Sequence, residues 1–385
     1  MMPPLLAGWV ADRALGDPRR GHPVAGFGRL AGRLEQLLWR DGRAAGAAYV
    51  AVLVGGPAAT VWVLQRRLPA RPGALLLALA TWAALGSRSL GREAAAVADA
   101  VARGDLGDAR RRLPALCGRD PSGLDGAELC RAAAESVAEN TADAVVGPLL
   151  WGALAGPAGV VAHRCANTLD AMVGYRSPRY ERFGWAAARL DDLVNWAPAR
   201  ATALLAAACT PLVGGSPRRA LAVLRRDGGG HPSPNAGRCE AAFAGALGVR
   251  LGGANRYGGR VEVRGPLGDG PPPTPADLRR AIRLSTAVGA LAALAASTRW
   301  RVPARWRRPG TAGFPVAWRR EVAWGGKAGC SSTPEPRGRV AWRWKVPWSV
   351  EVAWGRKLAG RRKLAWGGKA ASSGKATWPG TGVRR

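Results

Sequence analysis

Long apolar stretches alternate with polar, arginine-rich stretches along the first 300 residues of this chain. Residues 44–64 carry no charge, and as a helix they are long enough to cross the roughly 30 Å hydrocarbon layer of a membrane. Residues 73–86 are shorter and apolar, as are residues 145–162, where two prolines require that neighbouring groups satisfy the freed carbonyls. Residues 201–215 and 284–298 are marginal, because a buried soluble helix explains them equally well. The pattern predicts three to five membrane spans.

The polar segments between these stretches also have helical character. Apolar positions at residues 87–113 recur at helical spacing, which predicts an amphipathic helix. Its wet side would carry Arg88, Arg92, Glu93 and Asp99. Clusters of glycine and proline at residues 228–234 and 265–275 predict loops. The fold class expected is mainly α: a polytopic helical membrane protein with polar helical loops, in the inner (cytoplasmic) cell membrane.

The last 85 residues are of a different kind. From residue 301 there are 20 Lys and Arg against three Asp and Glu, so this segment carries +17 of the net charge of +31. Tryptophans from residue 300 to 378 are spaced by multiples of six, apart from Trp344, and this period matches neither a helix nor a strand. We therefore predict two parts: a membrane domain at 1–300 and a disordered, basic Trp/Gly/Lys/Arg tail at 301–385.

The charge of the tail raises two alternatives, binding of nucleic acid or contact with anionic lipid. We expect no nucleic-acid partner, because a translated short repeat is the simplest origin of such a pattern. The six cysteines are scattered without a CxxC pair, which argues against a zinc site or a disulfide framework. The N-terminus lacks a basic region before its apolar run, so no cleavable signal is expected.

Three carboxylates precede the apolar stretch at 145–162. Glu135, Glu139 and Asp143 are spaced by four residues, which places them on one face of a helix where like charges repel. A bound cation or facing arginines would remove this conflict. Carboxylate oxygens suit Mg²⁺, so all three are candidate metal ligands, and Glu139 and Asp143 are also candidate catalytic residues. A solvated acidic face is the alternative.

Two further clusters combine carboxylates with arginine and asparagine. One follows the same apolar stretch and the other lies about a dozen residues beyond it. Their carboxylates are candidate metal ligands, namely Asp170, Asp191 and Asp192; Arg164, Asn167, Arg189 and Arg200 are candidate ligands for substrate or phosphate. Adjacent aspartates on a helix point about 100° apart, so at most one of Asp191 and Asp192 would face a given metal. Helix N-capping explains one of them equally well.

A fourth cluster lies in the predicted loop at 228–234 and just after it. His231, Ser233 and Asn235 alternate with two prolines that restrict the backbone, directly before a run of small residues. Ser233 and Asn235 are candidate phosphate ligands at a helix start. His231 is a candidate catalytic base, although a histidine in such a loop can equally be structural.

Six short motifs now occur in one order along about 250 residues. They are Gly-Asp-Pro with His-Pro-Val (16–24), Glu-Asn-Thr-Ala-Asp (139–143), Asn-Thr-Leu-Asp-Ala-Met-Val-Gly-Tyr (167–175), Ala-Arg-Leu-Asp-Asp (188–192), His-Pro-Ser-Pro-Asn-Ala-Gly (231–237) and the glycine-rich run at 245–257. In this combination the chain resembles the CobD/CbiB family of adenosylcobinamide-phosphate synthases. The resemblance covers residues 5 to about 298 and none of the tail.

The resemblance implies a membrane enzyme of cobalamin biosynthesis. It implies ATP-dependent joining of adenosylcobyric acid to aminopropanol phosphate, or a related amino alcohol, with ATP as co-substrate and Mg²⁺ as cofactor. Expected partners are the corrinoid and amino-alcohol phosphate substrates, membrane lipid and other cobalamin-pathway proteins. Two alternatives stay open: a Mg²⁺-dependent membrane prenyl- or phospho-alcohol transferase, whose aspartates are usually one helical turn apart, and a non-catalytic membrane scaffold.

Overall fold

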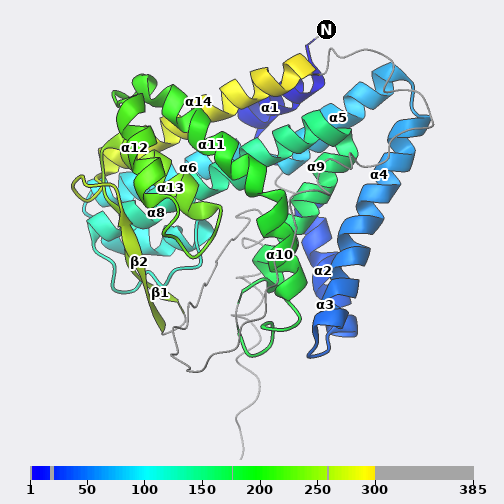
Figure 1. Ribbon diagram of the computed structural model, residues 1–385, viewed down its shortest axis with the longest axis horizontal. Coiled ribbons are helices and arrows are strands. Elements are labelled where there is room, and N and C mark those ends of the chain that lie inside the picture. Colours follow the sequence, from blue (N-terminus) through cyan, green and yellow to red (C-terminus); the bar gives the residue numbers. More distant parts are fainter. Residues whose placement is uncertain (1, 18–20, 176, 258–259, 300–385) are drawn as a thin grey trace, which may run out of the picture.

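The structure is a computed structural model and describes residues 2–17, 21–175, 177–257 and 260–299. It is almost entirely helical, with a single two-stranded antiparallel sheet among the described residues (Figure 1). The predicted mainly α class is therefore confirmed. The predicted tail at 301–385 lies outside the described residues.

Helices of very different lengths make up the chain. In order they are α1 (Pro4–Leu15), α2 (Pro23–Leu38), α3 (Arg43–Val50), the π-helix η1 (Ala51–Gly55), α4 (Gly56–Arg67), α5 (Ala70–Ala84), α6 (Ser87–Ala102), α7 (Leu106–Arg112), the 3₁₀-helix η2 (Leu113–Ala115), α8 (Gly126–Thr141), the π-helix η3 (Ala142–Val146), α9 (Gly147–Val173), α10 (Trp185–Val194), α11 (Trp196–Cys209), the 3₁₀-helix η4 (Thr210–Val213), α12 (Pro217–Asp227), α13 (Ala236–Leu247) and α14 (Pro275–Arg299). The strands β1 (Leu251–Tyr257) and β2 (Arg260–Leu267) lie between α13 and α14.

Among the described residues, four helical stretches are long and apolar enough to cross a membrane, which agrees with the predicted three to five. They are Arg43–Arg67, Ala70–Ala102, Gly126–Val173 and Pro275–Thr298. The marginal stretch at 284–298 belongs to the last of them. The other marginal stretch, 201–215, falls mainly on α11 and η4, which are too short to be among the four. One face of α11 packs against α13 and α14, whereas Trp196 and Leu204 on its other face are exposed.

The amphipathic helix expected at 87–113 is present but divided. Arg88, Arg92 and Asp99 are exposed, as predicted, and α6 ends at Ala102. Gly104 then adopts a φ of 77°, a left-handed conformation that favours glycine, so the helix cannot continue unbroken. Asp105 starts α7 by accepting a hydrogen bond from the backbone N–H of Asp108 at 2.8 Å.

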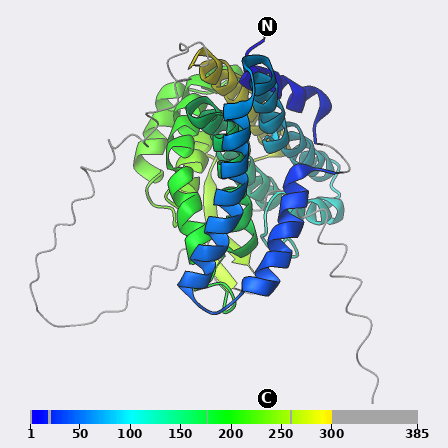
Figure 2. The same cartoon turned by 90° about the vertical axis from the view of Figure 1, so that its right-hand side faces the viewer.

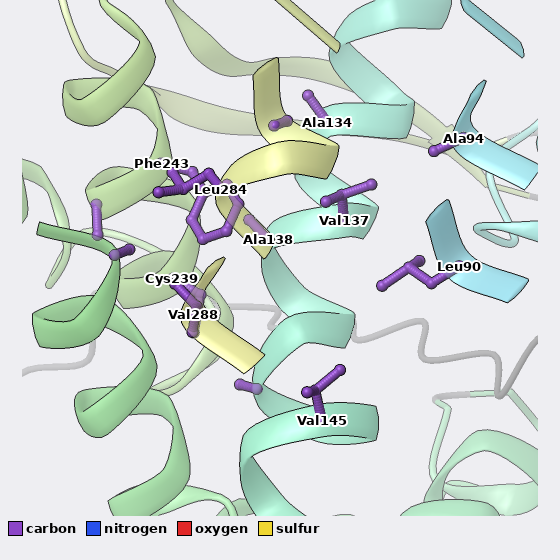
Figure 3. Close-up of a cluster of buried hydrophobic side chains, with 14 of the residues drawn as sticks. Leu90, Ala94, Ala134, Val137, Ala138, Val145, Cys239, Phe243, Leu284 and Val288 are labelled. Carbon is purple, nitrogen blue, oxygen red and sulfur yellow. The ribbon is translucent and has the colours of Figure 1, made fainter. Parts of the chain in front are cut away.

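The main hydrophobic core surrounds α8. Val137 and Ala138 of α8 lie between Leu90 of α6, Leu284 of α14 and Phe243 of α13 (Figure 3). Many of these core side chains are alanines, which allows the helices to approach one another closely. Two of the three predicted carboxylates, Glu135 and Glu139, therefore lie on a helix that is packed into the core.

A second, smaller core lies where α3 and η1 pack near the C-terminal end of α9. Tyr49 and Phe183 are both fully buried there, with ring centroids 5.1 Å apart. The Tyr49 hydroxyl donates a hydrogen bond to the carbonyl of Ala31 in α2 at 3.1 Å. Figure 2 shows α3, η1 and α4 as one continuous blue rod along the length of the molecule. The rod buries residues in its first half, in α3 and η1, whereas its second half, α4, packs along α9 without fully burying any residue.

The ends of this rod carry arginine–tryptophan pairs. The Arg66 guanidinium lies 3.8 Å from the Trp62 ring centroid at one end, and Arg43 lies 5.4 Å from Trp185 at the other. Tryptophan and arginine near the ends of an apolar helix are typical of the membrane–water interface. The predicted span at 44–64 is confirmed as the apolar part of this rod.

The predicted span at 145–162 falls inside a longer helical stretch that bends. Gly156 has a φ of 67°, and Pro157 follows it inside α9. Proline removes a backbone N–H and clashes with the preceding turn, which explains the kink. The Gln65 side chain of α4 lies against Gly156, where an added Cβ would be 3.2 Å from its Oε1.

The sequence reasoning missed the β-hairpin. Strand β2 overlaps the predicted loop at 265–275, and β1 pairs with it in antiparallel register, with a shift between Leu251 and Gly253. Gly258-Gly259, followed by residues of alternating polarity at 260–264, was the available signal, because such a dipeptide in the sequence is typical of a tight hairpin. The hairpin matters for the site because its strands contact α8 and α13.

Candidate active site

A network of buried charges holds the hairpin against α8. Glu135 is 3% exposed and forms ion pairs with Arg119 and, at 3.7 Å, with Arg131. It also accepts a hydrogen bond from the Gly252 N–H at 2.8 Å. Arg131 in turn donates to the carbonyls of Gly252 and Ala254 of β1. The sequence left two ways to offset the repulsion between these carboxylates, a bound cation or facing arginines. For Glu135 the structure shows facing arginines.

A second buried carboxylate, Glu240 of α13, lies beside this network. Its Oε1 is 4.0 Å from Nη1 of Arg264 in β2, and its Oε2 is 3.8 Å from Nε2 of His231. Removal from water, followed by the negative charge of Glu135, raises the pKa of Glu240 to about 8. The sequence reasoning assigned Glu240 no role, because only the packing of α13 against α8 brings the two glutamates together.

The His-Pro-Ser-Pro-Asn loop connects this region to α10. The Ser233 hydroxyl accepts hydrogen bonds from the N–H groups of Asn235 and Ala236 and so caps the start of α13. Asn235 donates from Nδ2 to the Asp192 carbonyl at 2.9 Å. An added Cβ at Gly237 would lie 2.2 Å from the His231 Cβ, so only glycine fits there. The loop motif is therefore explained first by packing and capping.

Asp191 anchors a chain of hydrogen bonds between α10 and α9. Asn195 donates to its Oδ1 at 2.8 Å, and Asn167 donates to the same atom at 3.2 Å. His163 Nε2 lies 2.9 Å from Asn195 Oδ1, and Arg164 donates to Asn167 Oδ1 at 3.2 Å. All five side chains are at most 5% exposed.

The adjacent aspartates of α10 behave as their spacing predicts. Asp191 is fully buried against α9, whereas Asp192 is half-buried. N-capping explains neither of them, because α10 begins at Trp185 and the N-cap of α11 is Asn195. That expectation was wrong because two helices meet here almost without a loop.

Asp143 lies in the π-helical turn η3, between α8 and α9. The Asp143 side chain is 2% exposed, and its negative charge interacts electrostatically with His163 and Arg164. The neighbouring Ala144 carbonyl accepts a hydrogen bond from the Gly86 N–H at 3.1 Å, which fixes η3 beside the start of α6. π-turns of this kind are frequent at functional sites.

The Gly-Asp-Pro and His-Pro motifs near the N-terminus meet the same place. Asp17 accepts a hydrogen bond from the Ser89 hydroxyl at 2.7 Å, and its other oxygen lies 3.6 Å from His22 Nε2. The negative charge of Asp17 also interacts electrostatically with Arg164. Burial, followed by the charge of Asp17, raises the pKa of the nearby Asp12 to about 6. Sequence reasoning assigned Asp17 and His22 no role, although their motif was one of the six quoted.

The remaining predicted residues lie at the edges of this arrangement. Glu139 is half-buried on α8, and its charge acts on Glu240. Asp170 is buried near the end of α9, where an added Cβ at Gly174 would be 2.1 Å from its Oδ1. Arg189 is exposed on α10. Arg200 donates to the Trp196 carbonyl at 2.9 Å, with its guanidinium 4.1 Å from that residue's ring centroid. Their roles stay predictions.

Together these contacts form one polar band through a largely apolar domain. The band runs from Asp17 and Arg164, through Asp191, Asp192 and the 231–235 loop, to Glu240. A family model described as CobD/Cbib protein matches residues 5–285, which include this whole band. The chain belongs to the CobD/CbiB family.

Relatives in this family cover most of the described residues. Cobalamin biosynthesis protein CobD of Mycobacterium tuberculosis (strain ATCC 25618 / H37Rv) is 58% identical over 293 residues, which are 76% of this chain and 93% of that protein. The protein of the same name from Pelobacter propionicus is 46% identical over 267 residues, 68% of this chain and 83% of that protein. That from Rhodobacter capsulatus is 45% identical over 283 residues, 71% and 89% respectively. No solved structure matches this chain.

The sequence of this CobD/CbiB chain predicted six carboxylates as ligands for Mg²⁺. Within the described ranges, no three His, Cys, Asp or Glu side chains lie close enough to form a metal site by themselves. The six predicted metal ligands thus do not form one cluster. Magnesium is usually held by one or two carboxylates together with waters and substrate phosphates. Asp17 and Asp143, whose charges both interact with the buried Arg164, are carboxylates of this kind.

Proposed function

We propose that this protein joins adenosylcobyric acid to aminopropanol phosphate, or to a related amino alcohol, by an amide bond that gives adenosylcobinamide phosphate. ATP is the co-substrate and Mg²⁺ the cofactor in this proposal. The family is a cobalamin-biosynthesis family, and relatives at 45–58% identity share its name. The observation that carries the proposal is the buried polar band, which places arginines and carboxylates together inside a membrane domain. A scaffold has no need for charges that are so costly to bury.

The chemistry of amide formation requires such a band. A propionate carboxylate is a poor electrophile and needs activation, most simply as an acyl phosphate. Magnesium would supply neutralisation of phosphate charge, held by Asp17 and Asp143. Arg164, which is buried and whose charge interacts with both carboxylates, would bind the γ-phosphate of ATP while a propionate oxygen attacks its phosphorus and ADP leaves. The amine would then attack the acyl carbon, and phosphate would leave as the amide forms.

The amine of the amino alcohol must lose its proton before it attacks. Glu139 is suited to receive it because it is half-buried, whereas Glu135 is held by two arginines and Gly252. A base near the activated carboxyl also keeps the amine nucleophilic at neutral pH. The site is expected at the inner (cytoplasmic) cell membrane, near other cobalamin-pathway proteins that supply or consume corrinoids.

The test is a defined assay. Membranes that contain the protein are supplied with adenosylcobyric acid, aminopropanol phosphate, ATP and Mg²⁺, and the product is separated and weighed by mass spectrometry. The expected mass is that of the two substrates joined with loss of water. Absence of this product, when a CobD relative makes it under the same conditions, contradicts the proposal. Omission of ATP or replacement of Mg²⁺ by EDTA is expected to abolish the product.

A further inference from the structure

Helix α10 contains a fully buried carboxylate, Asp191, whose Oδ1 accepts two hydrogen bonds. The donors are Nδ2 of Asn195 at 2.8 Å and Nδ2 of Asn167 at 3.2 Å. Each asparagine has a second partner on its Oδ1. Asn195 Oδ1 lies 2.9 Å from His163 Nε2, and Asn167 Oδ1 accepts from Arg164 Nη1 at 3.2 Å. Asp191 is therefore joined to a histidine and to an arginine of α9 by unbroken hydrogen bonds.

The chemistry of the end groups fixes the direction of these hydrogen bonds. A carboxylate can only accept, so both asparagines must present Nδ2 to Asp191 and Oδ1 to their other partner. A guanidinium can only donate, which is what Asn167 Oδ1 requires of Arg164. The same reasoning applied to Asn195 requires that His163 donates from Nε2. The proton of the neutral His163 ring therefore lies on Nε2.

This assignment leaves His163 with one nitrogen that can accept. The ring is 1% exposed, and its Nδ1 has no hydrogen-bond partner among the described residues. The ring lies beside the start of α9, since an added Cβ at Gly147 would be 2.4 Å from its Cε1 and Nε2. The negative charge of Asp143 in η3 interacts electrostatically with it. A ligand that hydrogen-bonds to the neutral ring must therefore donate to Nδ1, as an amine N–H can and an ionised phosphate oxygen cannot.

The helix that carries Asp191 is itself held by hydrogen bonds to its backbone. Asn235 of the 231–235 loop donates to the Asp192 carbonyl at 2.9 Å, and Trp151 Nε1 of α9 donates to the Val194 carbonyl at 2.9 Å. Groups whose supports are fixed in this way hold a functional side chain within a narrow range of positions. The position of Asp191 is therefore set by the loop and by α9 together.

We propose that Asp191 is a positioning residue of the active site. Through Asn167 it orients the Arg164 guanidinium. Through Asn195 it holds the His163 ring with the ring proton on Nε2. This role takes the place of the metal-ligand role that the sequence predicted for Asp191. The inference rests on the proposed function where activity is measured, because Arg164 binds the transferred phosphate there, whereas the tautomer of His163 is measured without any substrate.

The first test separates positioning from metal binding. Asp191→Asn keeps the shape and an acceptor oxygen but loses the charge, so it is expected to lose about tenfold in kcat for amide formation. Asp191→Ala removes both hydrogen bonds and is expected to lose about 10²-fold or more. The Mg²⁺ concentration for half-maximal rate is expected to be unchanged in Asp191→Asn. A rise in that concentration, or wild-type activity of Asp191→Ala, overturns the inference.

The rates in this test are compared for equal amounts of folded, membrane-inserted protein, measured by immunoblot of membrane fractions and by thermal denaturation. Glu181→Gln is the matched control, because Glu181 is exposed between α9 and α10. It is expected to retain the wild-type rate and Mg²⁺ dependence. If Asp191→Ala does not fold, Asp191→Asn still decides between the two roles.

The second test asks whether Asp191 acts through Asn167. The Asn167→Ala/Asp191→Asn double variant is expected to be no slower than the slower of the two single variants, because both substitutions interrupt one connection to Arg164. Independent structural contributions would instead multiply the two losses. Multiplied losses therefore overturn the inference.

The third test measures the tautomer of His163. The full-length protein, labelled with ¹⁵N-histidine and placed in lipid vesicles, is measured by solid-state NMR at pH 8, and the His163 signals are assigned by their loss in His163→Gln. A ring with its proton on Nε2 is expected. In Asn195→Leu the acceptor for this proton is removed, and the Nδ1–H form is expected to appear. An Nδ1–H ring in the wild-type protein, or an unchanged spectrum in Asn195→Leu, overturns the inference.

The tests distinguish failure of the inference from failure of the proposed function. If the wild-type protein forms no amide at all, the proposed function fails, and the His163 spectra still decide whether Asp191 and Asn195 fix the ring. If the amide forms but the His163 ring carries its proton on Nδ1, the inference fails and the proposed function stands.

Discussion

In the part of the chain that the structure describes there are two π-helical turns, each inside a long apolar helix, and one is largely exposed whereas the other is buried. In the Arg43–Arg67 helix, which contains η1, 17% of the most apolar segment is buried. In the Gly126–Val173 helix, which contains η3, 61% of the most apolar segment is buried. Val52 of η1 is 56% exposed, whereas Asp143 of η3 is 2% exposed beside Arg164. The same local structure therefore presents an apolar side chain outward in one helix and a carboxylate to the polar band in the other.

Variants in the two π-helical turns, η1 and η3, are expected to differ most in their rates of amide formation. Asp143→Ala is expected to reduce amide formation by about 10²-fold or more, because it removes a charge beside the proposed phosphate-binding arginine. Val52→Ala, in the other π-turn, is expected to change it by less than about twofold. Both variants should reach the membrane in wild-type amounts, as measured by immunoblot of membrane fractions. Equal activity of the two variants would remove the functional distinction between the turns.

The buried charge of Glu135 in α8 is expected to have a large effect on the free energy of unfolding. Glu135→Ala leaves Arg119 and Arg131 without their carboxylate, which is expected to cost about 3–5 kcal/mol of unfolding free energy. The exposed Glu181, between α9 and α10, is the control, and Glu181→Ala is expected to cost less than about 0.5 kcal/mol. Denaturation of the detergent-solubilised protein, followed by fluorescence, measures both. A Glu135 variant as stable as the control would show that the network does not hold the hairpin.

Replacing glycine by alanine is expected to destabilise the protein at Gly147 in α9 and to stabilise it at Gly56 in α4. An added Cβ at Gly147 would lie 2.4 Å from the His163 ring, so Gly147→Ala is expected to cost about 1–3 kcal/mol through overpacking. At Gly56 of α4 nothing lies within 4 Å, and Gly56→Ala is expected to gain about 0.5–1 kcal/mol from helix propensity. The same denaturation measurement applies. A stabilising Gly147→Ala would contradict the close approach of the His163 ring to Gly147.

The pH dependence of stability is expected to report Glu240. Burial raises its pKa from 4.5 to about 8, so between these values the folded protein holds a proton that the unfolded chain has released. Stability therefore falls as pH rises through this window, by up to about 1.4 kcal/mol per unit, and this contribution is level above pH 8. Glu240→Gln is expected to remove the dependence. Midpoint temperatures of both proteins from pH 5 to 9 measure it, and parallel curves would contradict it.

The smallest effect is expected from the tail. Deletion of residues 301–385 is expected to leave amide formation within about twofold of wild type, because the family match ends at residue 285 and the polar band lies before it. The comparison uses equal amounts of membrane-inserted protein. A loss of tenfold or more would show that the tail takes part in the function.

Much of the fold followed from the sequence because lipid and water select residues locally. An uncharged run such as 44–64 is recognisable without knowledge of its neighbours, since its length alone meets the membrane thickness. The loop at 228–234 was equally local, because glycine and proline restrict the backbone wherever they occur. The hairpin was missed because its strand β1 is held by hydrogen bonds with Glu135 and Arg131, which lie more than a hundred residues earlier.

The candidate site divides in the same way. The sequence by itself identified the residue types, the motifs and the family, since these depend only on the order of residues along the chain. Only the tertiary structure decided that Glu135 pairs with arginines, that Asp17 and Asp143 share Arg164, and that Glu240 faces His231. The physical reason is that a buried charge is tolerated only beside partners, and here those partners come from helices and strands that are remote in the sequence.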